Sequence, residues 1–371
     1  MFDRRLLHNI DYWFLFLVAA LTLLGLGALY AATGDPGGSL ATTFRHQLWW
    51  IGIGLAGMAL VAPLNYNKLR VWAYFFYALC LLLLLLVLLV GHTGLGAQRW
   101  VNIGPFRLQP SEVSKLAVIL ALARFLAAGR FRGSLGLREI LGPTLLLVLP
   151  LILILQQPDL GTSLMFLFIG GVMVFCAGLQ LWLIAAVFPI TVFLAPILWR
   201  GLQDYQQRRI LAFLKPDLDP FGSGYHVIQS KIAIGSGGLW GKGLFQGTQS
   251  ELHFLPEQHT DFIFSVIAEQ FGLVGCLLFL LLYTLLILRG LEIAYETDDT
   301  FGALIVVGVT TMIAFYVLVN VGMTTGLLPV VGVPLPFVSY GGSSMLTMWM
   351  GAGLILNVRM RKFLFQAKQG T

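Results

Sequence analysis

One carboxylate in this sequence stands at the edge of a long apolar run. The stretch FLPEQHTDFIFSVIAEQFG begins at Phe254, and Asp261 immediately precedes its apolar part. A carboxylate in that place can act as a general base, or it can cap the helix that follows. Glu269 lies about two helical turns further on and on nearly the same face. An acid inside a membrane span suggests a function, whereas an internal hydrogen bond or salt bridge is the simpler interpretation of Glu269.

Two further polar motifs contain acids. In QPSEVSK, which runs from Gln109 to Lys115, a helix is expected to begin at Pro110. Glu112 and Lys115 are three residues apart, so they share a helix face and can pair; the alternative is a capped helix entry with a snorkelling lysine. In QQPDLGT, Asp159 can cap the next helix. Unpaired polar groups are costly at a membrane edge, so this turn should have partners, with Lys115 a candidate.

An arginine pair and a glycine-rich run also deserve an interpretation. Arg208 and Arg209 follow DYQQ and suit a phosphate or diphosphate group, or they form a solvated loop pair. The run GSGGLWGKGLFQGTQS from Gly235 does not match the phosphate-binding pattern G-x-x-x-x-G-K-[ST], because Ser236 and Gly243 break it. Its backbone could form an anion-binding nest, or the run could simply be a loop.

Metal-ligand side chains occur close together around the opening motif. His253, Glu257, His259 and Asp261 have the right chemistry, but the H-E-x-x-H pattern is absent. The three cysteines lie singly in apolar runs, where they behave as small hydrophobic residues. The sequence therefore predicts neither a zinc site nor a disulfide framework, and no metal ligand is assigned.

The composition places these motifs in a membrane protein. The chain has 371 residues, of which 58% are hydrophobic and 11% are charged, whereas a soluble domain carries about 25% charged residues. The net charge is +6, and no dense basic run with interleaved aromatic residues occurs. Nucleic acid is therefore excluded as a partner.

Ten apolar segments are long enough to cross a bilayer, for which about 20 residues are needed. We therefore predict an all-α integral membrane protein with about ten transmembrane helices in a single polytopic domain, residues 1–371. The predicted spans are 12–32, 46–62, 70–90, 112–128, 140–156, 161–178, 181–199, 262–288, 301–322 and 342–358.

Basic residues orient these spans. With the N-terminus inside, the inner segments hold 13 of the 23 Lys and Arg residues and the short outer loops hold four, which predicts that both termini are cytoplasmic. The polar segments 91–111, 200–260 and 323–341 then lie outside. The largest, 200–260, separates the seventh and eighth spans. Within it Tyr225, Ile228 and Ile232 recur at helical spacing, which indicates an interfacial helix.

Several of these motifs together resemble one known family. The chain is similar to the SEDS proteins (shape, elongation, division and sporulation) over about residues 91–345. The resemblance is carried by GAQRWVNIGPFRLQPSEVSKLA, QQPDLGTS, DYQQRRI, GYHVIQSKIAIGSGGLWGKGLFQGTQS, FLPEQHTDFIFSVIAEQFGLVG and LPVVGVPLPFVSYGGSS. One stretch departs from the family pattern, because DYQQRRI replaces DYQRQR: Arg209 keeps its place, whereas Arg208 is shifted.

The resemblance implies a peptidoglycan glycosyltransferase of the bacterial cytoplasmic membrane that serves cell elongation and rod shape. Such proteins polymerise lipid II, an undecaprenyl-pyrophosphate-linked disaccharide pentapeptide, at the extracytoplasmic face. They work with a class B penicillin-binding protein and other membrane proteins of the elongation complex. The family's essential aspartate corresponds to Asp261, and its buried acidic pair corresponds to Glu112 and Asp159.

This implied function suggests roles for the polar residues. Asp261 would deprotonate the acceptor, while Arg209, Lys115 and a divalent cation (Mg²⁺ or Mn²⁺) would stabilise the leaving diphosphate; no organic cofactor is expected. The residues expected to bind substrate or support the site are Glu112, Asp159, Gln109, Arg99, Lys231 and Ser339. Two alternatives remain: a lipid II flippase, and a scaffold that only recruits a penicillin-binding protein.

Overall fold

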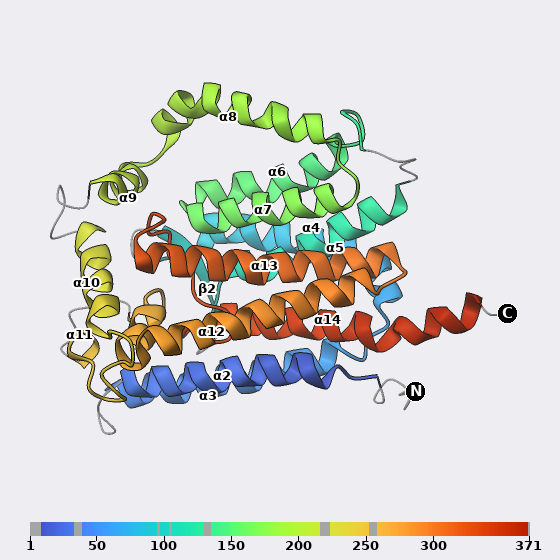
Figure 1. Cartoon of the computed structure of the whole chain (residues 1–371). Helices are drawn as coiled ribbons and strands as arrows, with labels where there is room; N and C mark the ends of the chain where they lie inside the picture. Colours follow the sequence, from blue (N-terminus) through green and yellow to red (C-terminus); the bar gives the residue numbers. More distant parts are fainter. Residues whose placement is uncertain are drawn as a thin grey trace.

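The protein is a bundle of long helices, seen in a computed structural model that describes residues 9–32, 39–94, 97–103, 106–129, 135–215, 223–251 and 258–369. The long helices run roughly along one axis (Figure 1). The start of α2 (Tyr12–Ala32) and the end of α14 (Gly342–Gln369) lie at one end of the bundle, and α10 (Ser223–Ser236) runs across the opposite end. We call these the terminal end and the loop end.

All ten apolar segments predicted from the sequence form helices. The largest difference is at α14, which continues eleven residues beyond the predicted end of its span at 358. The ten helices are α2 (Tyr12–Ala32), α3 (Ser39–Val61), α4 (Tyr66–Val90), α5 (Pro110–Ala128), α6 (Leu141–Gln156), α7 (Leu160–Cys176), α8 (Leu181–Gly201), α12 (Ile263–Tyr295), α13 (Thr300–Thr325) and α14 (Gly342–Gln369).

Helix length and hydropathy identify a multi-pass membrane protein. Within the described ranges, α2, α4, α12 and α13 are long and apolar enough to cross a bilayer, with mean hydropathies from 2.3 to 2.7. Helices α6 and α7 are apolar but shorter. A shorter apolar helix can still span where the bilayer thins or where flanking residues snorkel, so the count of ten spans remains a prediction.

Helix α13 is the centre of the bundle. Within its most apolar 18-residue window 78% of the residues are buried, compared with 28% for α4 and α12. It packs against α5, α7, α12 and α14, while α8 stands at the edge (Figure 1). A helix covered on all sides can carry polar side chains only where neighbours satisfy them, so polar residues on α13 mark connections between helices.

The segment 91–111, predicted as a loop, contains a small antiparallel sheet in the order β1-β2-β3. Its strands are β1 (His92–Gly94), β2 (Ala97–Ile103) and β3 (Phe106–Leu108). The all-α prediction was therefore wrong for these residues. Strand β2 packs on α4 and α5, and it carries Arg99 to the start of α7, beside Asp159.

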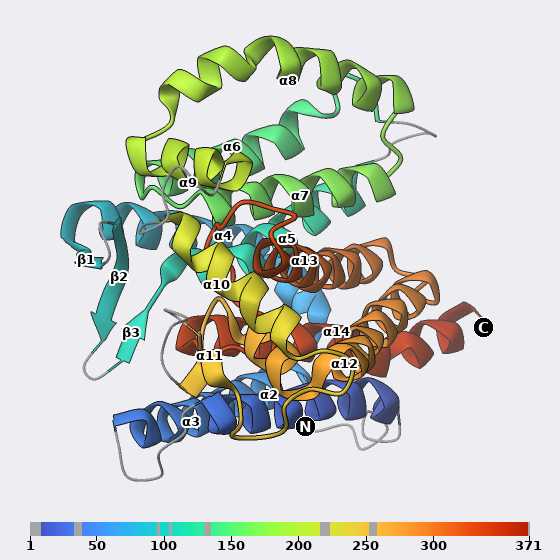
Figure 2. The same cartoon turned by 60° about the vertical axis from the view of Figure 1, so that its left-hand side comes forward.

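The long segment 200–260 is largely helical where it is described. It contains α9 (Asp204–Leu214), α10 (Ser223–Ser236) and the short α11 (Thr248–Glu251). A helix therefore forms around Tyr225 as predicted, and its interfacial position stays a prediction. Its buried face, however, carries Val227, Ser230 and Ala233, while Ile232 is 45% exposed. Helix α10 packs on α12 and α13 (Figure 2).

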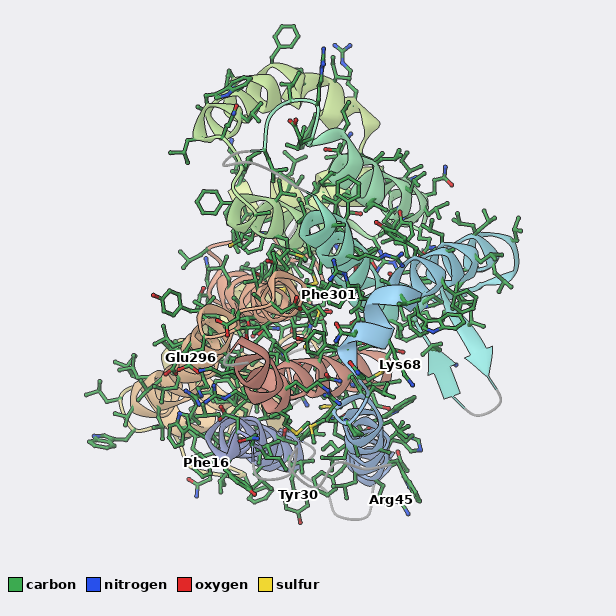
Figure 3. The ribbon with its side chains drawn as sticks, turned by 90° about the vertical axis from the view of Figure 1, so that its right-hand side faces the viewer. Phe16, Tyr30, Arg45, Lys68, Glu296 and Phe301 are labelled. Atoms are coloured by element: carbon green, nitrogen blue, oxygen red, sulfur yellow. The ribbon has the colours of Figure 1, made fainter. Side chains whose placement is uncertain are left out.

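A network of charges holds the terminal end, which faces the viewer in Figure 3 with Glu296 labelled. The buried carboxylate of Asp11 caps α2 by accepting from the Phe14 N–H at 2.9 Å. It also accepts from Arg289 of α12 at 2.6 Å and lies 3.4 Å from Arg359 of α14. Glu296 pairs with Arg359 and, at 3.0 Å, with Lys362. Three helices are thereby joined at this end.

Candidate functional site

Asp261 lies in a turn just before α12. The N-cap residue of α12 is Phe262, which makes no side-chain cap bond, so Asp261 is not the helix cap that the alternative interpretation required. Its side chain is partly exposed. One carboxylate oxygen is 3.3 Å from the position that a Cβ would take on Gly332, whose φ is +72°. A glycine at position 332 therefore permits both this turn and the close approach of Asp261.

A buried asparagine fixes the backbone of this turn. Asn320 of α13 is fully buried, and its side-chain amide donates to the carbonyl oxygens of Asp261 at 2.9 Å and Val333 at 2.7 Å. One side chain thus joins the segment that carries Asp261 to the segment that carries Gly332. Its two bonds restrain the backbone of both segments, and the Asp261 residue remains partly exposed.

Two predicted cations reach the same region. Arg209 of α9 donates to the carbonyl oxygen of Val330 at 3.3 Å. The stem of Lys231 lies across Gly326, because a Cβ there would stand 2.1 Å from its Cε. Gly326 caps the C-terminus of α13, where a positive charge is favourable. Asp261, Arg209 and Lys231 therefore converge on residues 326–333, which we call the exit segment.

A second cluster is buried beside α13. Lys115 and Glu112 form an ion pair at 2.6 Å, as predicted from their spacing, and α5 begins at Pro110. The Tyr316 hydroxyl donates to the other Glu112 oxygen at 2.8 Å and also contacts the Lys115 ammonium. Lys115 is 1% exposed and Glu112 5%. Their charges therefore compensate each other out of contact with water.

Asp159 caps α7, as the simpler interpretation of its motif proposed. Its carboxylate accepts from the Thr162 N–H at 3.2 Å and the Thr162 hydroxyl at 2.9 Å. Lys115 was expected as its partner, but the cation found beside it is Arg99, at 3.9 Å. Arg99 also donates to the carbonyl oxygens of Gln157 and Pro158. Lys115 instead pairs with Glu112 on its own helix. Arg99 comes from strand β2, which the sequence analysis did not predict.

Gln109 connects this turn to the start of α14. Its side chain donates to Asp159 at 3.4 Å and to Ser111 at 3.1 Å, while its backbone N–H donates to the Ser343 hydroxyl at 2.9 Å. The exit segment is the link between this cluster and Asp261. A Cβ on Gly161 would lie 2.9 Å from the Val331 carbonyl oxygen, so the start of α7 packs directly on the exit segment.

The polar residues of α13 were missed in the sequence analysis. Tyr316, Asn320 and Thr324 are four residues apart, and all three are almost completely buried. Tyr316 holds Glu112 and Lys115, and Asn320 holds Asp261 one turn further on, about 6 Å along the helix. Polar residues at every fourth position of an otherwise apolar span were visible in the sequence. They could have identified α13 as the helix that contacts both clusters.

Two predicted site residues are used by the fold itself. The Ser339 hydroxyl accepts from the Leu335 N–H at 2.7 Å and closes the turn before α14. Glu269 is fully buried and accepts from Lys242 at 2.8 Å and from the Gln249 N–H at 2.9 Å. The simpler interpretation of Glu269 is the one this geometry supports.

The described residues offer few ligands for a metal. Within the described ranges, no group of three or more His, Cys, Asp or Glu side chains could hold an ion. His253 and Glu257 lie outside those ranges. A divalent cation at Asp261 would need ligands from the substrate's diphosphate, whose oxygens suit Mg²⁺. The cation remains a prediction, and no step below depends on it.

The candidate site residues described above all lie within the part of the chain that one family model matches. The FTSW_RODA_SPOVE family model, described as a cell cycle protein, matches residues 11–363. The chain belongs to this family. The resemblance to SEDS proteins inferred from the motifs is therefore confirmed over almost the whole chain, including the N-terminal part that the motifs did not cover.

Relatives within the FtsW/RodA/SpoVE family are similar over most of their length. The chain is 42% identical over 355 residues to the peptidoglycan glycosyltransferase MrdB of Escherichia coli K12, which covers 95% of this chain and 94% of MrdB. It is 40% identical to stage V sporulation protein E of Bacillus subtilis over 319 residues, 85% of this chain and 86% of that protein.

Solved structures of the family share the fold. The rod shape determining protein RodA of Thermus thermophilus matches with a TM-score of 0.72 and 33% identity over 95% of this chain and 98% of RodA. A chain from "Structural coordination of polymerization and crosslinking by a peptidoglycan synthase complex" matches with a TM-score of 0.82 and 37% identity over the same shares.

Proposed function

We propose that this protein is a peptidoglycan glycosyltransferase that polymerises lipid II, with Asp261 as the general base. The observation that carries the proposal is the placement of Asp261. Its carboxylate is partly exposed in a turn that buried Asn320 restrains, beside an exit segment that Arg209 also reaches. The glycosyltransferase names of relatives such as MrdB support the reaction class.

In this mechanism Asp261 takes the proton from the 4-hydroxyl of the acceptor N-acetylglucosamine. The oxygen attacks the anomeric carbon of the donor N-acetylmuramic acid, and a β-1,4 bond forms with inversion. The bond from that carbon to phosphate breaks, and its electron pair leaves with undecaprenyl pyrophosphate. A positioned base contributes about 10²–10⁴-fold to such a step, and the anomeric carbon passes through an oxocarbenium-like state.

The remaining charges are arranged to bind rather than to react. Arg209 would face the leaving diphosphate, since guanidinium groups bind phosphate oxygens bidentately. The Glu112–Lys115–Tyr316 cluster is buried and internally satisfied, so we assign it to shaping the acceptor side of the site together with Asp159. We infer that the loop end, and the site with it, faces the extracytoplasmic side, where long translocated segments are expected.

The test is polymerisation of purified lipid II by the purified protein with its presumed partner. We expect Asp261→Asn to reduce glycan synthesis by about 10²-fold or more, because an amide cannot accept the proton. Product length on gels and release of undecaprenyl pyrophosphate measure the loss. Asp298→Asn, which changes an exposed acid before α13 at the terminal end, is the matched control and should polymerise normally.

Wild-type activity in Asp261→Asn would contradict its role as the base. A flippase is the alternative outcome, since transporters contain broken helices and α12 is broken at Gly272. Here, however, backbone groups beside the break are bonded to the protein's own loop. Translocation of lipid II in liposomes without polymer would favour the flippase; recruitment of a partner without either activity would favour the scaffold.

We further infer a class B penicillin-binding protein as partner, and the matched chain from a peptidoglycan synthase complex supports this. Co-purification from detergent with the transpeptidase encoded by the same bacterium would test it. A partner that stays bound in Asp261→Asn would separate assembly from catalysis.

A further inference from the structure

Helix α12 contains a break eleven residues after Asp261. Gly272 has φ 65° and ψ −163°, which is far from helical geometry and open essentially to glycine alone. The break divides α12 into an outer part, Ile263–Phe271, which follows Asp261, and an inner part that begins at Leu273. The direction of the outer part is therefore not set by continuation of the long apolar helix.

The glycine-rich run fills this break with its own backbone. In an unbroken helix, the N–H groups of Leu273 and Val274 would donate to the carbonyl oxygens of Glu269 and Gln270. The protein satisfies all four groups from the run instead. Leu273 N–H donates to Gly238 O at 2.9 Å and Val274 N–H to Leu239 O at 3.1 Å, while Glu269 O and Gln270 O each accept at 3.0 Å from the N–H groups of Lys242 and Gly243.

This backbone clamp explains the glycines that no sequence motif accounted for. A Cβ on Gly237 would lie 2.0 Å from the Ala268 carbonyl oxygen, and one on Gly241 would lie 2.1 Å from the Gln270 carbonyl oxygen. A Cβ on Gly272 would meet the Gly241 nitrogen at 2.3 Å. Glycine is required at these positions because two backbones meet without room for a side chain.

An ion pair between partly exposed Lys242 and buried Glu269 locks the clamp. The Glu269 side chain, fully buried on the outer part of α12, accepts from the Lys242 ammonium at 2.8 Å. The same carboxylate oxygen accepts from the Gln249 N–H of α11 at 2.9 Å. Glu269 thus holds both the glycine-rich run and the short helix that leads the chain back towards Asp261.

Helix α10, which precedes the run, lies along the same outer part. The rings of His226 and Phe262 stack with centroids 6.0 Å apart, and Phe262 is the neighbour of Asp261. One turn on, the buried hydroxyls of Ser230 and Ser265 are 2.6 Å apart. The segment 223–251 therefore contacts the outer part of α12 along its length, from Phe262 just before it to the break at Gly272.

We propose that Lys242 and Glu269 are positioning residues for Asp261, acting through the clamp that the glycine-rich run makes on the break of α12. The proposal rests on the transfer role of Asp261 stated above and goes beyond it by assigning the control of its position. The ion pair keeps the clamp closed, the clamp sets the direction of the outer part, and the outer part places Asp261 against the exit segment.

The experiment is steady-state lipid II polymerisation by the purified full-length chain with its partner, comparing Lys242→Met, Lys242→Arg and Glu269→Gln. We expect Lys242→Met to lower kcat by about 10- to 100-fold, the effect of displacing a catalytic group by about 1 Å. The KM for lipid II should stay within twofold of wild type. Lys242→Arg keeps the cation and should restore most of kcat.

Glu269→Gln is the second variant, because its amide oxygen can still accept from Gln249 while the ion pair is lost; kcat should fall in the same direction. Lys215→Met is the matched control and should behave as wild type. Lys215 is an exposed lysine of the segment 200–260, which also contains Lys242. Thermal unfolding in detergent confirms that each variant is folded.

The outcomes separate this proposal from the proposed function. Wild-type kcat in Lys242→Met and Glu269→Gln, with Asp261→Asn inactive, would overturn the positioning role alone. Activity in Asp261→Asn would overturn the role of the base whatever the Lys242 variants do. A change confined to KM in Lys242→Met, or failure of Lys242→Arg to restore kcat, would also overturn the proposal.

Discussion

The two ends of the bundle use charge in different ways. At the loop end, Lys115 and Glu112 are almost completely buried and share the Tyr316 hydroxyl. At the terminal end, Arg289 and Arg359 keep 18% and 19% of their side chains exposed while they bind buried Asp11. The cluster at the loop end is shielded from solvent, whereas the network at the terminal end is partly exposed to solvent.

We propose that this difference reflects two roles, one for the candidate site and one for the fold. A fully buried pair adds little net stability, because desolvation offsets most of the attraction. A partly hydrated network costs less to desolvate and joins three helix ends. We infer that the buried cluster exists for the adjacent site and the network for assembly of the bundle, and three predictions test this in order of decreasing effect.

The largest effect is expected from Lys115→Met. It leaves the Glu112 carboxylate buried without a countercharge, which costs about 3–5 kcal/mol. Thermal or denaturant unfolding in detergent measures this loss, and polymerisation should fall with it. The double variant Glu112→Gln/Lys115→Met removes both charges and should recover most of the stability but little of the activity. A stable and fully active double variant would make the cluster structural only.

An intermediate effect is expected from Asp11→Asn. Asparagine can still cap α2, but the charge that holds Arg289 and Arg359 is lost, and a hydrogen bond to a charged group contributes about 1.5–3 kcal/mol. Unfolding in detergent should show a loss of about 2 kcal/mol, with unchanged polymerisation per folded molecule. A loss of activity without a loss of stability would contradict the division between the two ends.

The smallest effect concerns pH at the terminal end. The hydrogen bond from Lys362, with the nearby charge of Arg359, holds the pKa of Glu296 below its ordinary value of 4.5. Because the pKa of Glu296 is lower in the folded protein than in the unfolded chain, its ionised form stabilises the fold above pH 4.5. This contribution disappears as the pH falls through the pKa of the folded state. Because the pair is partly exposed, we expect about 1 kcal/mol or less.

The comparison of wild type with Glu296→Gln measures this contribution. Their unfolding temperatures should differ slightly at pH 7 and converge in acid, as the pH falls through the lowered pKa of Glu296 and the carboxylate is protonated. High salt should reduce the difference at pH 7, because it screens exposed charges. A difference that persists in acid would show that packing, and not charge, accounts for the effect.

Local features of the molecule were predictable because their causes are local. An apolar run of about 20 residues predicts a helix wherever it lies in the bundle, and all ten runs formed one. The pairing of Glu112 with Lys115 follows from their spacing on one helix face. The cap at Asp159 follows in the same way from bonds to a residue three positions on.

Contacts between distant segments could not be predicted from spacing. Arg99 reaches Asp159 across 60 positions because a small sheet formed where a loop was expected. The link from Asn320 to Asp261 depends on how α12 packs against α13. The segment that forms the sheet is short and rich in glycine. Its three-residue strands β1 and β3 would not be stable alone and depend on packing against the helices.

The sequence by itself determined that this is a membrane protein of the FtsW/RodA/SpoVE family, and which residues can carry charge in it. Only the tertiary structure decided which charges meet. The glycines between 235 and 247 have no helical or phosphate-binding pattern of their own. Their role exists because Gly272 leaves backbone groups unpaired on another segment, and buried backbone groups must be satisfied by whichever segment the fold brings within hydrogen-bonding distance.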